Sequence, residues 1–102
     1  MSINIKRICG KNRVTREDGK VIYNLIAEKW KNDKKICIDF NNIRIASVSF
    51  LDEVFGKLAL KHDVKAIKNK IELVNVQPFD RALINDILLA RSKQRRDNNK
   101  AA

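Results

Sequence analysis

The sequence contains few of the residues that catalytic and metal-binding sites use. It has one histidine, His62, two cysteines and three glycines. A single histidine cannot build a histidine-rich metal site, and Cys9 and Cys37 lack the close spacing of a zinc or redox pair. Three scattered glycines cannot form a loop that cradles a nucleotide phosphate. We therefore expect no metal and no cofactor, and both cysteines to be buried, reduced thiols.

Long apolar runs are also absent. No stretch reaches the roughly 18 apolar residues of a membrane-spanning helix. Residues 1–10 lack the apolar segment of a signal peptide. We expect a cytoplasmic protein that does not enter a membrane. A chain of 102 residues, 44% of them hydrophobic, corresponds to one domain that can bury a core.

Positive charge is in excess. Lysine and arginine total 22 against 12 acidic residues, which gives a net charge of +10. We expect a domain at residues 1–90 followed by a basic polar tail at residues 91–102. The charge is typical of nucleic-acid-binding proteins, and this is the alternative function. Against it, aromatic residues make up only 6% of the chain, and no helix-turn-helix spacing or aromatic stacking platform is evident.

Apolar patterning predicts three strands that alternate with three helices. The strands are expected at residues 2–9, an edge strand, at residues 36–40, a central strand buried on both faces, and at residues 71–76. The helices are expected at residues 15–32, 49–62 and 78–90, with a lysine-rich connection at residues 63–70. The order β-α-β-α-β-α predicts an α/β fold, in which helices cover a small, mostly parallel sheet.

The second helix has the clearest amphipathic pattern. Its apolar residues recur at helical spacing and should face the sheet: Leu51, Val54, Phe55 and Leu58. Asp52, Glu53 and Lys57 are then expected on the outer side. Adjacent helical residues point about 100° apart, so the two carboxylates do not form an acid/base pair. With no histidine suitably placed either, we expect no enzymatic activity.

Polar residues follow the central strand and precede this helix. Asp39 ends the strand and Asn41-Asn42 makes a turn. The carboxylate lies where α/β proteins place binding sites, but it is more readily interpreted as a cap that accepts backbone N–H bonds. Ser49 is interpreted as the helix N-cap and Ser47 as a turn residue, with phosphorylation of either serine as the less favoured alternative.

The first helix offers one further candidate site. Thr15 is expected as its N-cap, and Arg16 beside it could bind an anion at the helix N-terminus. Ordinary capping and a solvated arginine are the favoured interpretation. Gly19 costs helix stability, which indicates close packing or the approach of a ligand, unless it is merely tolerated near the helix end.

Three segments carry a resemblance to a known family. Residues 14–19 (VTREDG), 38–43 (IDFNNI) and 46–55 (ASVSFLDEVF) are similar to small bacterial STAS-like domains of unknown function. The similarity extends over most of residues 5–80. The central part is more distantly similar to STAS domains proper, the anti-sigma-factor antagonist fold.

The resemblance implies a non-catalytic regulatory module that docks on a protein partner. In antagonists of this type the partner is a histidine-kinase-like ATPase, which phosphorylates a serine at the start of the helix after the central strand. Aligned from Asp39 without gaps, the customary phosphoacceptor position is Val48, so Ser47 and Ser49 are the candidate phosphoacceptors. The expected partner surface contains Asp39, Asn41, Asn42, Ser47, Ser49, Asp52 and Glu53, with the candidate anion-binding residues Thr15, Arg16 and Gly19 beside it.

Overall fold

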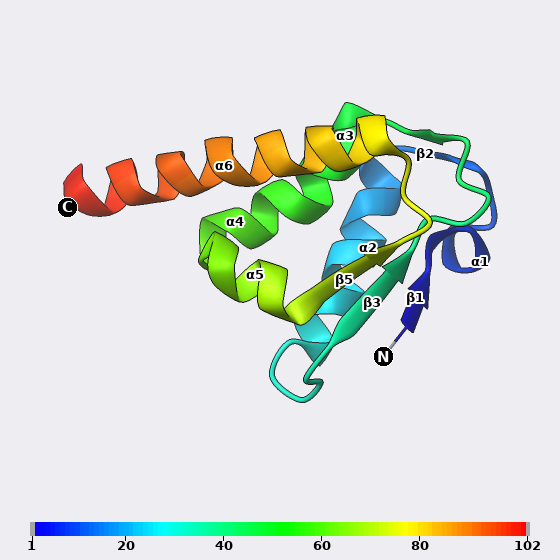
Figure 1. Ribbon diagram of the computed structural model, residues 1–102, viewed down its shortest axis with the longest axis horizontal. Helices are drawn as coiled ribbons and strands as arrows, with labels where there is room; N and C mark the ends of the chain where they lie inside the picture. Colours follow the sequence, from blue (N-terminus) through cyan, green and yellow to red (C-terminus); the bar gives the residue numbers. More distant parts are fainter. Residues whose placement is uncertain (1, 102) are drawn as a thin grey trace.

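A three-stranded parallel sheet and the helices that cover one of its faces form the body of the protein (Figure 1). We describe residues 2–101 of a computed structural model; of residue 45 and residues 98–101 the backbone alone is described. The elements are, in chain order, β1 (Ser2–Asn4), α1 (Ile5–Cys9), β2 (Arg13–Val14), α2 (Arg16–Lys29), β3 (Ile36–Asp39), β4 (Ile45–Ala46), α3 (Val48–Leu51), the π-helical turn η1 (Asp52–Gly56), α4 (Lys57–Lys61), α5 (Val64–Lys70), β5 (Ile71–Val74) and α6 (Pro78–Ala101).

The sheet has the strand order β1-β3-β5, and both neighbouring pairs are parallel. Ile3, Ile38 and Leu73 lie side by side across the three strands. Because parallel neighbours need long crossovers, helical segments connect the strands. The short strands β2 and β4 form a second parallel pair. The predicted α/β class, with a small parallel sheet covered by helices, is confirmed.

The central strand differs from the prediction on one face. Ile36 and Ile38 are fully buried under the helices, whereas Cys37 and Asp39 on the opposite face are partly exposed. The same alternation holds in β1, where Ile3 is buried and Ser2 is exposed. The expectation that residues 36–40 are buried on both faces is therefore wrong, because the helices cover only one side. Cys37 is correspondingly not a fully buried thiol, and Cys9 is also partly exposed.

The N-terminal segment is a shorter strand than predicted. β1 stops at Asn4, whose Oδ1 accepts a hydrogen bond from the backbone N–H of Arg7 at 2.9 Å and so begins α1. Gly10 ends this helix in the left-handed region, with a φ of 73°. The predicted strand at residues 2–9 is thus wrong beyond Asn4. β1 does form an edge of the sheet, as expected.

The C-terminal half is more helical than the sequence indicates. Residues 64–70, predicted as a connection, form α5, with Ile67 buried against the core. α6 continues past residue 90 as one helix of 24 residues. At about 1.5 Å per residue it spans about 36 Å, and Figure 1 shows it crossing the molecule over α4 and running on toward the C-terminus. Residues 91–101 are therefore the continuation of a helix that packs on the domain.

Candidate functional site

The start of α3 places the two candidate serines in different roles. The Oγ atom of Ser47 accepts a hydrogen bond from the backbone N–H of Phe50 at 3.1 Å, so Ser47 is the N-cap. The prediction that Ser49 caps the helix is wrong, because the helix begins two residues earlier. Ser49 lies exposed in the first turn, and its hydroxyl makes no hydrogen bond within residues 2–101. Val48, at the customary phosphoacceptor position, is 60% exposed.

A shallow cavity of about 280 Å³ adjoins this helix start. We call it the Ser49 hollow. It is lined by side chains from α2, from α3 and η1, and from α6: Arg16, Val48, Ser49, Asp52, Ile87, Ala90 and Arg91. Two of the predicted partner-binding residues and one predicted anion-binding residue therefore come together here. Arg91, which α6 contributes, was not among the predicted site residues.

Both arginines of the Ser49 hollow are held by carboxylates of η1. Arg16 Nη1 donates to Glu53 Oε2 at 2.7 Å. Arg91 binds Asp52 through two hydrogen bonds, Nε to Oδ1 and Nη2 to Oδ2, each 3.0 Å long. The hydrogen bonds that Arg91 donates to Asp52 raise the pKa of Arg91, which keeps the guanidinium charged. These ion pairs fix the two guanidinium groups at the rim of the hollow, beside the apolar side chains of Val48, Ile87 and Ala90.

Glu53 was predicted on the outer side of the helix, but it is buried. The residue is 5% exposed, and its carboxylate also accepts a hydrogen bond from Lys57, with Nζ 2.5 Å from Oε1. This bond and the bond from Arg16 outweigh the opposing effect of burial and lower the pKa of Glu53. The reason for the error is a tertiary contact: α2 packs against η1 and covers the side of the helix on which Glu53 lies. Glu53 therefore positions Arg16.

Gly19 explains how α2 comes close enough for this ion pair. A Cβ atom added at Gly19 would lie 2.9 Å from Cβ of Glu53 and 3.0 Å from the carbonyl oxygen of Phe50. The close-packing interpretation of Gly19 is therefore confirmed. Thr15 begins α2 as predicted, and both its backbone N–H and its hydroxyl donate to Asp18 Oδ2. Thr15, Arg16 and Gly19 are thus all engaged in intramolecular contacts.

The turn after β3 forms a separate polar cluster. Asp39 Oδ1 accepts hydrogen bonds from the backbone N–H of Asn41 at 2.8 Å and from Nδ2 of Asn75 at 2.9 Å. Asn42 and Asn75 both adopt positive φ, 62° and 57°, as asparagine tolerates better than most residues. The interpretation of Asp39 as a cap is confirmed. Its bond to Asn75 ties the ends of β3 and β5 together, a contact that the sequence analysis missed.

Two other findings bear on function. Within residues 2–101, no group of three histidine, cysteine, aspartate or glutamate side chains is arranged to hold a metal ion. None of the described helices combines the length and the apolar composition that crossing a membrane requires.

Comparison with known proteins identifies a family. The model of the STAS-like domain of unknown function (DUF4325) matches residues 18–81, which span α2, β3, the whole segment from α3 to α5, β5 and the start of α6. No curated protein and no solved structure matches the chain. The match covers more than half of the chain and includes three of the seven residues that line the Ser49 hollow, Val48, Ser49 and Asp52. This chain belongs to the family of STAS-like domains of unknown function.

Proposed function

We propose that this chain is a non-catalytic regulatory module that docks on a protein partner, a histidine-kinase-like ATPase, through the Ser49 hollow. The observation that carries the proposal is Val48, an apolar side chain 60% exposed at the helix start, with Arg16 and Arg91 beside it. An apolar centre with a charged rim is the usual composition of a protein interface. Membership of the STAS-like family favours the same function.

The partner surface extends from this hollow to the polar turn at the end of β3. Asn41 and Asn42 are exposed there, next to the carboxylate of Asp39. Such groups lie at the carboxyl ends of the strands, where α/β proteins commonly place their binding sites. Glu53 contributes indirectly, because its carboxylate fixes the guanidinium of Arg16.

Phosphorylation, if it regulates docking, acts on Ser49. Ser47 is a poor acceptor because its oxygen already accepts the capping hydrogen bond of α3. A phosphate on Ser49 would add about 1.5 to 2 negative charges at a helix N-terminus. In the Ser49 hollow it would compete with Asp52 for Arg91 and with Glu53 for Arg16, since arginine binds phosphate in a bidentate manner. The modification would thus change the charge and the shape of the docking surface without unfolding it.

A binding measurement tests the docking surface. The probe is a purified histidine-kinase-like ATPase of the same organism, titrated calorimetrically with wild type, Val48→Asp and Val21→Asp. Val21 is the matched control, because it is an exposed valine, 48% accessible, on the outer side of α2. We expect Val48→Asp to weaken binding at least tenfold, a loss of about 1.4 kcal/mol, and Val21→Asp to bind as wild type does. Equal binding by all three proteins would place the docking surface elsewhere.

The phosphorylation step has its own readout. After incubation with the ATPase and ATP, mass spectrometry of the wild type should detect a phosphate on Ser49, and Ser47→Ala should still be modified. Ser49→Ala should not be modified. A phosphate on Ser47, or none on either serine, would contradict this assignment. The calorimetric test of docking does not depend on this result.

Nucleic-acid binding is the second candidate, favoured by the net charge of +10 and by exposed cations on α6 such as Lys93 and Arg96. Charge-driven binding falls steeply with salt, because each phosphate contact releases counterions. Gel-shift titrations over a salt series decide between the two functions. Sequence-independent binding that survives physiological salt would favour nucleic acid as the partner.

A further inference from the structure

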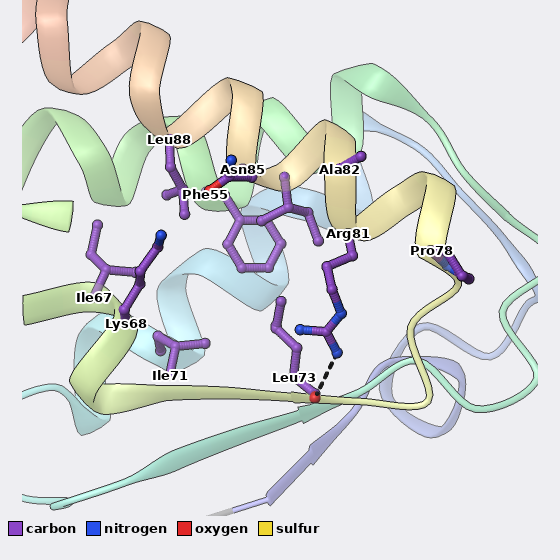
Figure 2. Close-up of a pocket in the computed structure, with 11 residues that line it drawn as sticks. Phe55, Ile67, Lys68, Ile71, Leu73, Pro78, Arg81, Ala82, Asn85 and Leu88 are labelled. Carbon is purple, nitrogen blue, oxygen red and sulfur yellow. Dashed lines mark hydrogen bonds between the residues drawn. The ribbon is translucent and has the colours of Figure 1, made fainter. Parts of the chain in front are cut away.

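A cavity larger than the Ser49 hollow lies away from it, between β5, α5 and α6. It is a groove of about 590 Å³, within the range of about 300–1,000 Å³ that is usual for small-molecule sites. Apolar side chains make up most of its wall: Phe55, Ile67, Ile71, Leu73, Pro78, Ala82, Ile84 and Leu88. Figure 2 shows Ile71 and Leu73 on β5 below and α6 above, with the ring of Phe55 between them.

The charged side chains of this groove all have the same sign. Lys68 and Arg81 line it, and no acidic residue does. Figure 2 shows Lys68 and Arg81 on opposite sides of Phe55, so the two cations flank the apolar centre. Such an arrangement attracts an anion toward an apolar surface.

Both cations are also available to a ligand. Arg16, Arg91 and Arg95 each form an ion pair with a carboxylate, whereas Lys68 and Arg81 form none with the residues that the structure describes. Arg81 donates one hydrogen bond, from Nη2 to the carbonyl oxygen of Leu73, and this bond is long at 3.4 Å. A carboxylate would offer the guanidinium two shorter, charge-assisted bonds in its place.

We propose that this groove binds a single-chain amphiphile with an anionic head, namely an unesterified long-chain fatty acid. The carboxylate binds Arg81, and Lys68 adds a second attraction across the groove. The alkyl chain lies along Phe55, Ile84 and Leu88, where it needs no hydrogen-bond partners and displaces water from apolar walls. The ligand class follows from the wall composition and from the sign of the two cations.

Calorimetric titration with sodium dodecanoate, below its micellar concentration, tests the proposal. We expect saturable one-to-one binding. Each buried methylene contributes about fourfold in affinity, so hexanoate should bind at least tenfold more weakly. Dodecanol has the same chain without the charge, and it too should bind at least tenfold more weakly. No binding of dodecanoate, or equal binding of dodecanol, would overturn the proposal.

Variants locate the site. Arg81→Gln and Lys68→Gln should each weaken dodecanoate binding by about twofold to fivefold, the usual range for an exposed charge contact. Arg96→Gln is the matched control, since it removes an exposed cation of α6 that does not line the groove, and it should bind as wild type does. An equal loss in Arg96→Gln would mean that the net charge of the protein, and not the groove, attracts the fatty acid.

A blocking substitution gives an independent readout. Ala82 and Asn85 are exposed residues of α6 that line the groove. Ala82→Trp should fill the groove and abolish binding, while circular dichroism remains that of the wild type. Should Ala82→Trp fail to fold, Asn85→Trp serves the same purpose from the next turn. Undiminished binding in a folded blocking variant would overturn the proposal, whereas the docking of a protein partner at the Ser49 hollow would be unaffected.

Discussion

Arg91 and Asp52 are 39 positions apart in the sequence, yet the guanidinium binds both oxygens of the carboxylate at 3.0 Å. The pair joins α6 to the π-helical turn. Gly56 makes room for it, because a Cβ atom there would collide with the Asp52 carboxylate. Arg95 repeats the arrangement one turn later, where it binds Asp63 at 2.7 Å. Two ion pairs therefore attach the C-terminal part of α6 to the rest of the domain.

Removal of the Arg91 side chain should loosen this attachment. The side chain is 40% exposed, so we expect Arg91→Ala to lower the free energy of unfolding by only about 0.5 to 1 kcal/mol, as for a partly exposed ion pair. Urea denaturation at low salt measures the change, which should shrink at high salt. Arg96→Ala, an exposed position without an ion pair in the described structure, should have no effect. An equal loss of unfolding free energy in both variants would show that the Arg91–Asp52 ion pair makes no specific contribution to stability.

Gly19→Ala tests the contact between α2 and η1. Alanine is a better helix former than glycine by about 1 kcal/mol, so an open position would be stabilised. Here the new methyl group would press on the Glu53 side chain and on the backbone carbonyl of Phe50. Overpacking of this kind costs about 1 to 3 kcal/mol, and we expect net destabilisation. The thermal midpoint of Gly19→Ala should therefore fall, whereas that of Asn24→Ala, an exposed position on the same helix, should not.

Acidification should weaken the protein through Glu53. Hydrogen bonding from Lys57, opposed by burial and supported by Arg16, lowers the pKa of Glu53 in the folded state. A group whose folded pKa lies below its unfolded value, about 4.3 for glutamate, binds protons more readily when unfolded. Its contribution to stability is therefore present above about pH 4.3 and is lost as the pH falls toward the folded pKa.

The variant Glu53→Gln isolates this contribution. Between about pH 5 and pH 3, the free energy of unfolding should fall less steeply in Glu53→Gln than in wild type. Some acid sensitivity should persist. Burial raises the pKa of Asp18, but the hydrogen bonds that Thr15 and Lys11 donate to it outweigh this effect, so the pKa of Asp18 is also lowered. Asp18 therefore contributes to the acid sensitivity that remains in Glu53→Gln. Identical pH profiles for the two proteins would exclude Glu53 as a source of acid sensitivity.

Asp39→Ala should separate the turn's structural role from its proposed role in docking. Loss of the acceptor for Asn41 N–H and for the Asn75 amide should lower the free energy of unfolding by about 0.5 to 1.5 kcal/mol. Asn41→Ala is the matched control, because only the backbone of Asn41 donates to Asp39. If partner binding falls in Asn41→Ala while stability does not, the exposed asparagine contacts the partner. An unchanged denaturation midpoint in Asp39→Ala would contradict the capping role.

Patterns that repeat along the chain were predictable from sequence. Leu51, Val54, Phe55 and Leu58 have helical spacing, and all four are buried as expected. The short apolar runs around Ile38 and Leu73 lie in parallel strands of one sheet. These elements were predictable because they follow from local patterning, although the run around Ile38 did not show that one face of β3 is partly exposed.

Contacts between distant residues and local departures from regular geometry were not predictable. Nothing in the spacing of Asp52 and Arg91, or of Asp39 and Asn75, indicates that they meet. Asn4 ends a strand early because its side chain caps a helix, although the apolar residues around it alternate as in a strand. Glu53 was predicted on the outer side because the amphipathic pattern does not show that α2 packs there. The missed parts of the site are those that depend on tertiary contacts.

The π-helical turn also marks the place where this segment can change its length. A π-turn holds about one residue more than an α-turn, so the extra residue is taken up within residues 52–56 and the helices on either side keep their rotational phase. Deletion of one residue from the turn should therefore restore α-helical spacing and leave Leu58 and Ala59 in the core. Deletion of one residue from the regular α-helical part, such as Lys57, would instead rotate everything after it by about 100° and turn Leu58 and Ala59 out of the core. Single-residue deletions should consequently be tolerated better at residues 52–56 than in α4.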